Sequence, residues 1–169
     1  MNNEINIAPY LAKAKTEYVA TDYSEFPKED VYKIIIDEFS IKTENIAGRT
    51  FYGIGAKFHI KGGLANEISH EWRFSLLPYT MQSTAESLVS IAMQSGQNID
   101  ESACTTLEGL ILELNKKLKG TSQQRCFPNL EKALIGEVSM SPSVCGTGYE
   151  DPSIKDDEND MDYIRNQFL

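Results

Sequence analysis

The sequence is poor in the residues that usually carry metal or redox chemistry. It holds three cysteines and two histidines among 169 residues, and no Cys-x-x-Cys pair. Structural zinc sites use closely spaced pairs of ligands, whereas Cys104, Cys126 and Cys145 lie 22 and 19 residues apart. We therefore expect no metal site and no cofactor.

The three cysteines cannot all pair with one another within one chain. The favoured interpretation is free thiols in a reducing compartment, and the alternative is a bridge between Cys126 and Cys145. Cys104 is expected in the first turn of a helix, where the helix dipole lowers the pKa of a thiol. A catalytic nucleophile is one interpretation of Cys104, and a small residue packed in the core is the favoured one.

Long apolar runs are also missing. None approaches the roughly 18–20 residues that a membrane-spanning helix needs. The first fifteen residues include Glu4 and lack the apolar region of a secretion signal. We expect a cytoplasmic protein, of a cell or of an agent that infects one, that does not bind membranes.

Clusters of basic residues are scarce, and the formal net charge is −9. Residues 150–169 contain seven acids against Lys155 and Arg165, which leaves the rest of the chain with a net charge of −4. Nucleic-acid-binding faces are built from clustered lysines and arginines. The densest group, three lysines within residues 116–119, falls where a helix is expected to end. Direct binding of nucleic acid is therefore disfavoured.

Two runs of alternating apolar and polar residues, 51–61 and 67–76, are the clearest structural pattern. They predict an antiparallel hairpin that is buried on one face. Its register places small Ala56 opposite large Trp72 on the buried face. On the wet face it places opposite charges across from each other, namely Lys57 with Glu71 and Lys61 with Glu67.

The same alternation separates the two histidines, with His59 on the wet face and His70 on the apolar face. They cannot share a metal ion or act as an acid–base pair. His70 is interpreted as a core histidine, with a lone general base as the alternative. The wet face also carries Arg73 and the glycine strip Gly53 and Gly55, which lacks the third glycine of a dinucleotide-binding turn. The strip is interpreted as a twist or bulge, or as a docking surface.

Helical periodicity occupies much of the remaining chain. Ser83 and Glu86 have the spacing of a capping box. The predicted elements are helices over 27–39, 83–96, 100–119 and 129–135, and an edge strand over 137–141. The β-branched residues over 31–36 leave a strand as the alternative for the first of these helices. The helices over 83–96 and 100–119 are expected to pack as an antiparallel pair on the apolar face of the hairpin. The predicted fold is α+β and two-layer, with a hairpin or three-stranded sheet covered on one face by two to three α-helices.

The composition fits one globular domain over residues 1–148, followed by an acidic tail over 149–169 that is predicted to be mobile. An amphipathic segment ends the tail, and such segments bind in grooves of partner proteins. Its acids would steer it toward a basic surface; a solvated terminus is the alternative. The apolar anchors are Met161, Ile164 and Phe168, preceded by Asp156, Asp157 and Glu158.

The favoured function is a non-enzymatic protein–protein interaction module, which means an acidic inhibitor, adaptor or assembly factor acting on a larger complex of a host or of a defence system. Exposed hairpin edges would allow a homodimer. The binding residues would be the six tail residues together with His59, Arg73, Gly53 and Gly55. One alternative is an accessory protein of nucleic-acid metabolism with an acidic recruiting tail. Another is a small enzyme whose site would join Glu67, Glu71 or Glu137.

Overall fold

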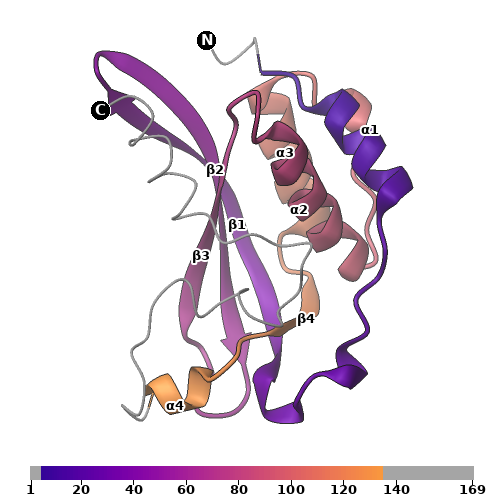
Figure 1. The fold of residues 1–169 in the computed structure, drawn as a ribbon, viewed down its shortest axis with the longest axis vertical. Coiled ribbons are helices and arrows are strands. Elements are labelled where there is room, and N and C mark those ends of the chain that lie inside the picture. Colours follow the sequence, from indigo (N-terminus) through magenta and orange to yellow (C-terminus); the bar gives the residue numbers. More distant parts are fainter. Residues whose placement is uncertain (1–4, 135–169) are drawn as a thin grey trace.

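The computed structural model describes residues 5–134, which form an α+β fold with a four-stranded antiparallel sheet in the order β3-β2-β1-β4. Helices α1, α2 and α3 gather on one side of this sheet, and α4 lies near the opposite end of the molecule (Figure 1). The strands are β1 (Val31–Ile46), β2 (Arg49–Lys61), β3 (Ser69–Ser75) and β4 (Ser122–Cys126). The helices are α1 (Ala8–Glu17), α2 (Met81–Gln94), α3 (Leu107–Leu118) and α4 (Leu130–Leu134), with short 3-10 turns η2 (Tyr23–Glu25), η3 (Lys28–Asp30) and η4 (Glu101–Ala103).

The prediction of a helix over residues 27–39 is wrong, because most of this stretch belongs to β1. A β-bulge lies between Ile36 and Glu38, so that Asp37 has no partner in the ladder with β2. A bulge adds one residue and shifts the alternation of the strand. Buried Ile36 is therefore followed by buried Phe39 after an interval of three residues, and this interval imitates helical spacing.

Strands β2 and β3 pair in the register that the alternation predicts. Ala56 lies opposite Trp72, and Phe58 lies opposite His70. Strands β1 and β2 are joined at Ala47–Gly48, which both have positive φ angles, as a two-residue hairpin turn requires. β1 pairs with β2 along one of its edges and with β4 along the other.

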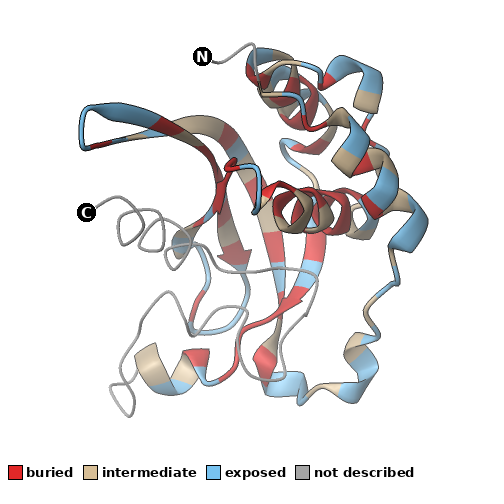
Figure 2. Ribbon diagram, turned by 45° about the horizontal axis from the view of Figure 1, so that its top comes forward, coloured by how far each residue is buried: buried red, intermediate tan, exposed pale blue. Residues whose placement is uncertain are grey.

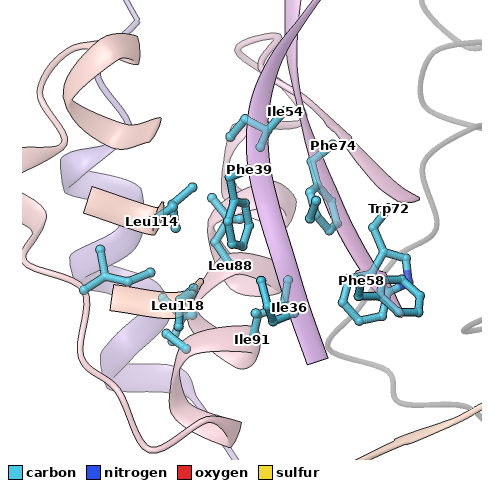
Figure 3. Close-up of a cluster of buried hydrophobic side chains, with 14 of the residues drawn as sticks. Ile36, Phe39, Ile54, Phe58, Trp72, Phe74, Leu88, Ile91, Leu114 and Leu118 are labelled. Carbon is cyan, nitrogen blue, oxygen red and sulfur yellow. The ribbon is translucent and has the colours of Figure 1, made fainter. Parts of the chain in front are cut away.

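One continuous core joins the sheet to the helices (Figure 3). From the sheet it takes Ile36, Phe39 and Ile54, and from α2 and α3 it takes Leu88 and Leu114, all at most 1% exposed. Burying such side chains contributes about 1.5–3 kcal/mol each. Figure 2 shows the buried residues on the sides of the helices that face the sheet.

Two details of the helix predictions are wrong. Helix α2 begins at Met81 after Thr80, so Ser83 lies inside the helix and does not cap it. Helix α3 begins at Leu107, because the Thr106 side chain accepts a hydrogen bond from the Gly109 N–H, while Asp100 caps only η4. The predicted packing of α2 on α3 is also not the main helix contact, which joins α2 to α1.

A side chain of α3 forms hydrogen bonds with the backbone of β1 beyond the point where the pairing with β4 ends. The Asn115 side-chain oxygen accepts a hydrogen bond from the Phe39 N–H at 2.8 Å, and its nitrogen donates to the Phe39 carbonyl at 3.0 Å. Both backbone groups of Phe39 on this side are thereby satisfied, as buried peptide groups require. Asn115 thus replaces a strand partner directly after the bulge.

Candidate functional site

The predicted surface residues of the hairpin lie on the face of the sheet that is turned away from Ile54, Phe58 and Phe74. We call this the outer face. It presents His59 and Gly55 from β2 and Arg73 from β3, because odd-numbered residues of both strands point the same way. His70 lies on the opposite face, where its ring meets Phe58 edge-on at 5.7 Å between centroids.

His59 is held by two carboxylates on the outer face. Its Nδ1 lies 2.7 Å from Asp37 Oδ1, and its Nε2 lies 4.0 Å from Glu67 Oε2. The bulge explains the first contact, because it places Asp37 and Glu38 consecutively on the outer face. Asp37 was missed in the sequence because its segment was interpreted as a helix.

The glycine strip gives room to an ion pair. Lys42 Nζ lies 3.1 Å from Glu71 Oε2, and the two side chains meet above Gly55, where an added Cβ would lie 2.5 Å from Lys42 Cε and 2.8 Å from Glu71 Oε2. Arg73 Nε lies 3.3 Å from the other oxygen of Glu71. Gly55 is therefore required for packing between charged side chains of β1 and β3.

The charge pairs expected across the hairpin are present only in part. Lys61 pairs with Glu67 as predicted. Lys57 lies opposite Glu71 in the ladder, but the ion pairs of Glu71 join it to Lys42 and Arg73. A hollow of about 430 Å³ opens beside these residues and is lined by Lys57, Ser69, His70, Glu71 and Arg73.

Two of the acids that a small enzyme would have to bring together have different ion-pair partners within the described chain. Glu67 pairs with Lys61 beside His59, whereas Glu71 pairs with Lys42 and Arg73. Within residues 5–134, no three His, Cys, Asp or Glu side chains come close enough to hold a metal ion. The third acid, Glu137, lies outside the described residues.

Cys104 and Cys126 are both buried thiols. Cys104 follows η4 and lies before α3, so it is not in the first turn of that helix as expected. Burial, reinforced by the nearby Glu113 and Asp100 carboxylates, raises the pKa of Cys104 to about 12. A thiol with this pKa is protonated at neutral pH and is a poor nucleophile.

A second surface, which the sequence did not indicate, follows the outer edge of β4, where no further strand of residues 5–134 pairs. The bonds Ile36 N–H to Thr121 carbonyl and Phe127 N–H to Asp30 carbonyl flank the ladder of β1 and β4. In an antiparallel ladder, bonded and non-bonded residues alternate. The backbone groups of Gln123 and Arg125 therefore point toward β1, and those of Ser122 and Gln124 point away from it.

Two hollows run beside this edge and share Thr21, Tyr23 and Gln124 in their walls. We call them together the β4 groove. The first measures about 480 Å³ and is lined by Tyr18, Ala20, Thr21, Tyr23, Lys33, Met93, Gln94, Ser122, Gln123 and Gln124. The second measures about 630 Å³ and is lined by Thr21, Asp22, Tyr23, Ser24, Phe26, Lys28, Val31 and Gln124. Both hollows are open to solvent along the edge of the sheet.

Buried polar contacts fix the wall of the β4 groove. The Tyr23 hydroxyl donates to Gln94 Oε1 at 3.0 Å and accepts from Arg125 Nη1 at 3.4 Å. Arg125 is 2% exposed, and its Nε donates to Gln123 Oε1 at 2.6 Å. These contacts tie the segment around η2 to α2 and β4, so the groove is formed before any partner arrives.

The charge of the β4 groove is positive. Lys28 and Lys33 line it, and neither takes part in an ion pair within the described part of the chain. Asp22 is the single acid in the lining. It accepts hydrogen bonds from the side chain and backbone of Ser24, which lower its pKa. Glu25 and Glu29 belong to the same segment but do not line the hollows.

The predicted tail residues lie outside the described residues, and this applies equally to the predicted strand over 137–141 and to Cys145. The tail residues are Met161, Ile164, Phe168, Asp156, Asp157 and Glu158. Among the helices between residues 5 and 134, none is long and apolar enough to cross a bilayer.

Comparison with known proteins gives no relative from which a function could be inferred. No family model, no curated protein and no solved structure matches this chain. Function must therefore be argued from the two surfaces described above.

Proposed function

We propose that this protein is a non-enzymatic protein–protein interaction module, of the kind that serves as an inhibitor, adaptor or assembly factor. In a two-layer arrangement, with helices on one face of the sheet, the sheet edges and the outer face remain for partners. The observation that carries the proposal is the outer edge of β4, which no other strand of the described chain covers and whose outward backbone groups border the β4 groove. An exposed edge is a template for pairing with another chain.

The outer face supports the same function in a second way. It is a broad surface of exposed charges, with Lys57 and Arg73 beside the hollow of about 430 Å³. Ion pairs at the rim of an interface set partner choice and association rate more than affinity. In this proposal β4 supplies affinity, and the outer face adds selectivity.

The tail is a further part of the proposal, and it rests on sequence alone. Its acidic residues would steer it toward a basic surface of the partner, and its apolar anchors would bind there. A full-length variant with Met161→Ala, Ile164→Ala and Phe168→Ala should then capture the partner less well. Capture equal to that of the wild-type protein would show that the tail does not belong to the binding surface.

The experiment is affinity capture from a lysate of the native source, read by quantitative mass spectrometry. The informative variant is Gln124→Pro, because proline removes the outward N–H of an edge strand without touching the ladder with β1. The matched control is Ser69→Pro, which makes the same change on the free edge of β3. We expect specific partners to be lost with Gln124→Pro and retained with Ser69→Pro.

Two results would contradict this assignment. Capture of the same partners by both variants would show that the β4 edge is not the binding element. Loss in both variants together with a lowered melting temperature would show that the substitutions act on the fold. In that case, chemical crosslinking of the wild-type complex must place the partner beside Gln124, and crosslinks elsewhere would refute the proposal.

A further inference from the structure

We infer that the β4 groove binds an extended acidic peptide of a partner protein, which joins the sheet as a fifth strand beside β4. This inference rests on the proposed function and names the class of partner. It is carried by three features of the groove: the direction of the backbone groups of β4, the positions of two lysines, and the separation of apolar from cationic lining.

The first feature is the hydrogen-bonding edge. Ser122 and Gln124 are exposed, and their backbone groups point into the groove because those of Gln123 and Arg125 are turned to β1. The residues of β4 present one donor and one acceptor at every second position along the strand. A partner in extended conformation can match this spacing, whereas a helix satisfies its own backbone groups and cannot.

The second feature is charge. Lys33 lines the first hollow and Lys28 the second, and Asp22, the acid in the lining, is engaged with Ser24. A peptide with carboxylates along its length would therefore meet cations at both ends of the groove. A basic peptide would meet repulsion at the same two places, so charge selects against it.

The third feature is the division of the groove into two sides. Lys33 and Gln124 lie opposite each other in the ladder of β1 and β4, and both side chains lie on the outer face of the sheet. Tyr18 and Met93 line the same hollow, and Met93, on α2, is an exposed apolar residue. Because side chains of a strand alternate between two faces, the bound peptide should alternate acidic residues toward Lys33 with apolar residues toward Met93.

The probe for this inference is a phage-displayed library of random twelve-residue peptides, panned on the full-length protein. We expect the enriched peptides to have net negative charge and to alternate acidic with apolar residues. The most enriched peptide is then synthesised with a fluorescent label, and its dissociation constant is measured by fluorescence anisotropy. Its binding should weaken at least tenfold in a Lys28→Glu, Lys33→Glu variant and in Gln124→Pro.

A matched control separates the groove from other surfaces. Lys13→Glu reverses an exposed lysine on α1, outside the lining of the groove and outside the outer face, and it should leave the dissociation constant within twofold of wild type. Amide hydrogen exchange should show slower exchange at Ser122 and Gln124 when the wild-type protein is saturated with the peptide. This measurement uses no substitution, so it does not depend on the folding of any variant.

Several outcomes would overturn the inference. They are enrichment of neutral or basic peptides, failure to enrich any peptide, equal binding by the lysine variant, and unchanged exchange at Ser122 and Gln124. Displacement of the peptide by an oligothymidylate of twenty nucleotides would assign the lysines to phosphate groups instead. If partner capture still depends on Gln124 while acidic peptides fail, the proposed function stands and only this partner class is refuted.

Discussion

The guanidinium carbon of Arg125 lies 5.5 Å from the centroid of the Trp72 ring. These residues belong to β4 and β3, the two outermost strands of the sheet, so their side chains meet across β1 and β2. The contact combines a cation with an aromatic face in a buried site, where such pairs are strongest. It couples the β4 groove to the opposite edge of the sheet.

Replacing Arg125 tests this contact. Arg125→Leu removes the cation over Trp72 and leaves Gln123 Oε1 without its donor, so we expect a loss of about 2–4 kcal/mol in the free energy of unfolding. The measurement is urea denaturation followed by tryptophan fluorescence, which reports on Trp72, the one tryptophan of the chain. Lys57→Leu, at an exposed position, is the control and should change stability by less than about 0.5 kcal/mol. An unchanged midpoint for Arg125→Leu would mean that the cost of burying the charge offsets its contacts.

Asn115 should be the polar residue of α3 that matters most to the sheet. Asn115→Ala leaves the N–H and the carbonyl of Phe39 without their side-chain partners, and this should cost about 2 kcal/mol. Leu112→Ala, on the same helix but 71% exposed, should cost little. Thermal denaturation of both variants gives the comparison, and equal melting temperatures would show that water replaces Asn115 at no cost.

Gly55 should couple Lys42 to Glu71. Gly55→Ala pushes both side chains aside and should cost about 1 kcal/mol, the upper end for a partly exposed ion pair. In a Lys42→Ala background the same substitution should cost less, because both the ion pair and the Lys42 Cε that lies over Gly55 are already absent. The four melting curves of this double-mutant cycle supply the measurement. Additive effects would contradict the assignment of Gly55 to the ion pair.

The stability of the fold should fall at alkaline pH. The pKa of the Cys104 thiol is raised to about 12 by burial, whereas a thiol in an unfolded chain titrates near pH 8.5. From about pH 9 upward the unfolded state loses this proton while the folded state keeps it, so the free energy of unfolding decreases as pH rises toward 12. Burial also raises the pKa of Tyr32 to about 12, which adds to the same decrease.

The check is urea denaturation between pH 8 and 11. Cys104→Ala should flatten the decrease, and Tyr32→Phe should flatten it further, while Leu112→Ala, at an exposed position that does not titrate, serves as the control. Iodoacetamide at pH 8 should modify Cys104 in the native protein far more slowly than free cysteine. A native rate equal to that of free cysteine would show that the thiol is accessible and ionised.

The sequence allows the β2–β3 ladder to be predicted because its signal is strictly local. Apolar and polar residues alternate along most of both strands, and this alternation restricts the register to every second possibility. A five-residue loop over 62–66 then selects the register of residues 53–59 against 69–75, which places small Ala56 opposite large Trp72. The stripes of α2 and α3 are equally plain, and only their first residues were misplaced.

Strand β4 and the two surfaces could not be predicted from the sequence, and the reasons are physical. In β4 the residues that face the core are Gln123 and Arg125, so an apolar alternation is missing where a strand is present. Their burial depends on partners from α2 and η2, which no local pattern reveals. The β4 groove and the contact of Asp37 with His59 are products of this tertiary arrangement, and so neither surface could be assembled from the sequence.

The bulge at Asp37 has a consequence for the length of the chain. Removing one residue from a regular strand turns every following side chain to the wrong face. Removing Asp37 should instead restore an unbroken ladder with β2, with Ile36 and Phe39 still facing the core. β1 should therefore tolerate the deletion of one bulge residue, Asp37 or Glu38, better than a deletion anywhere in its regular segments.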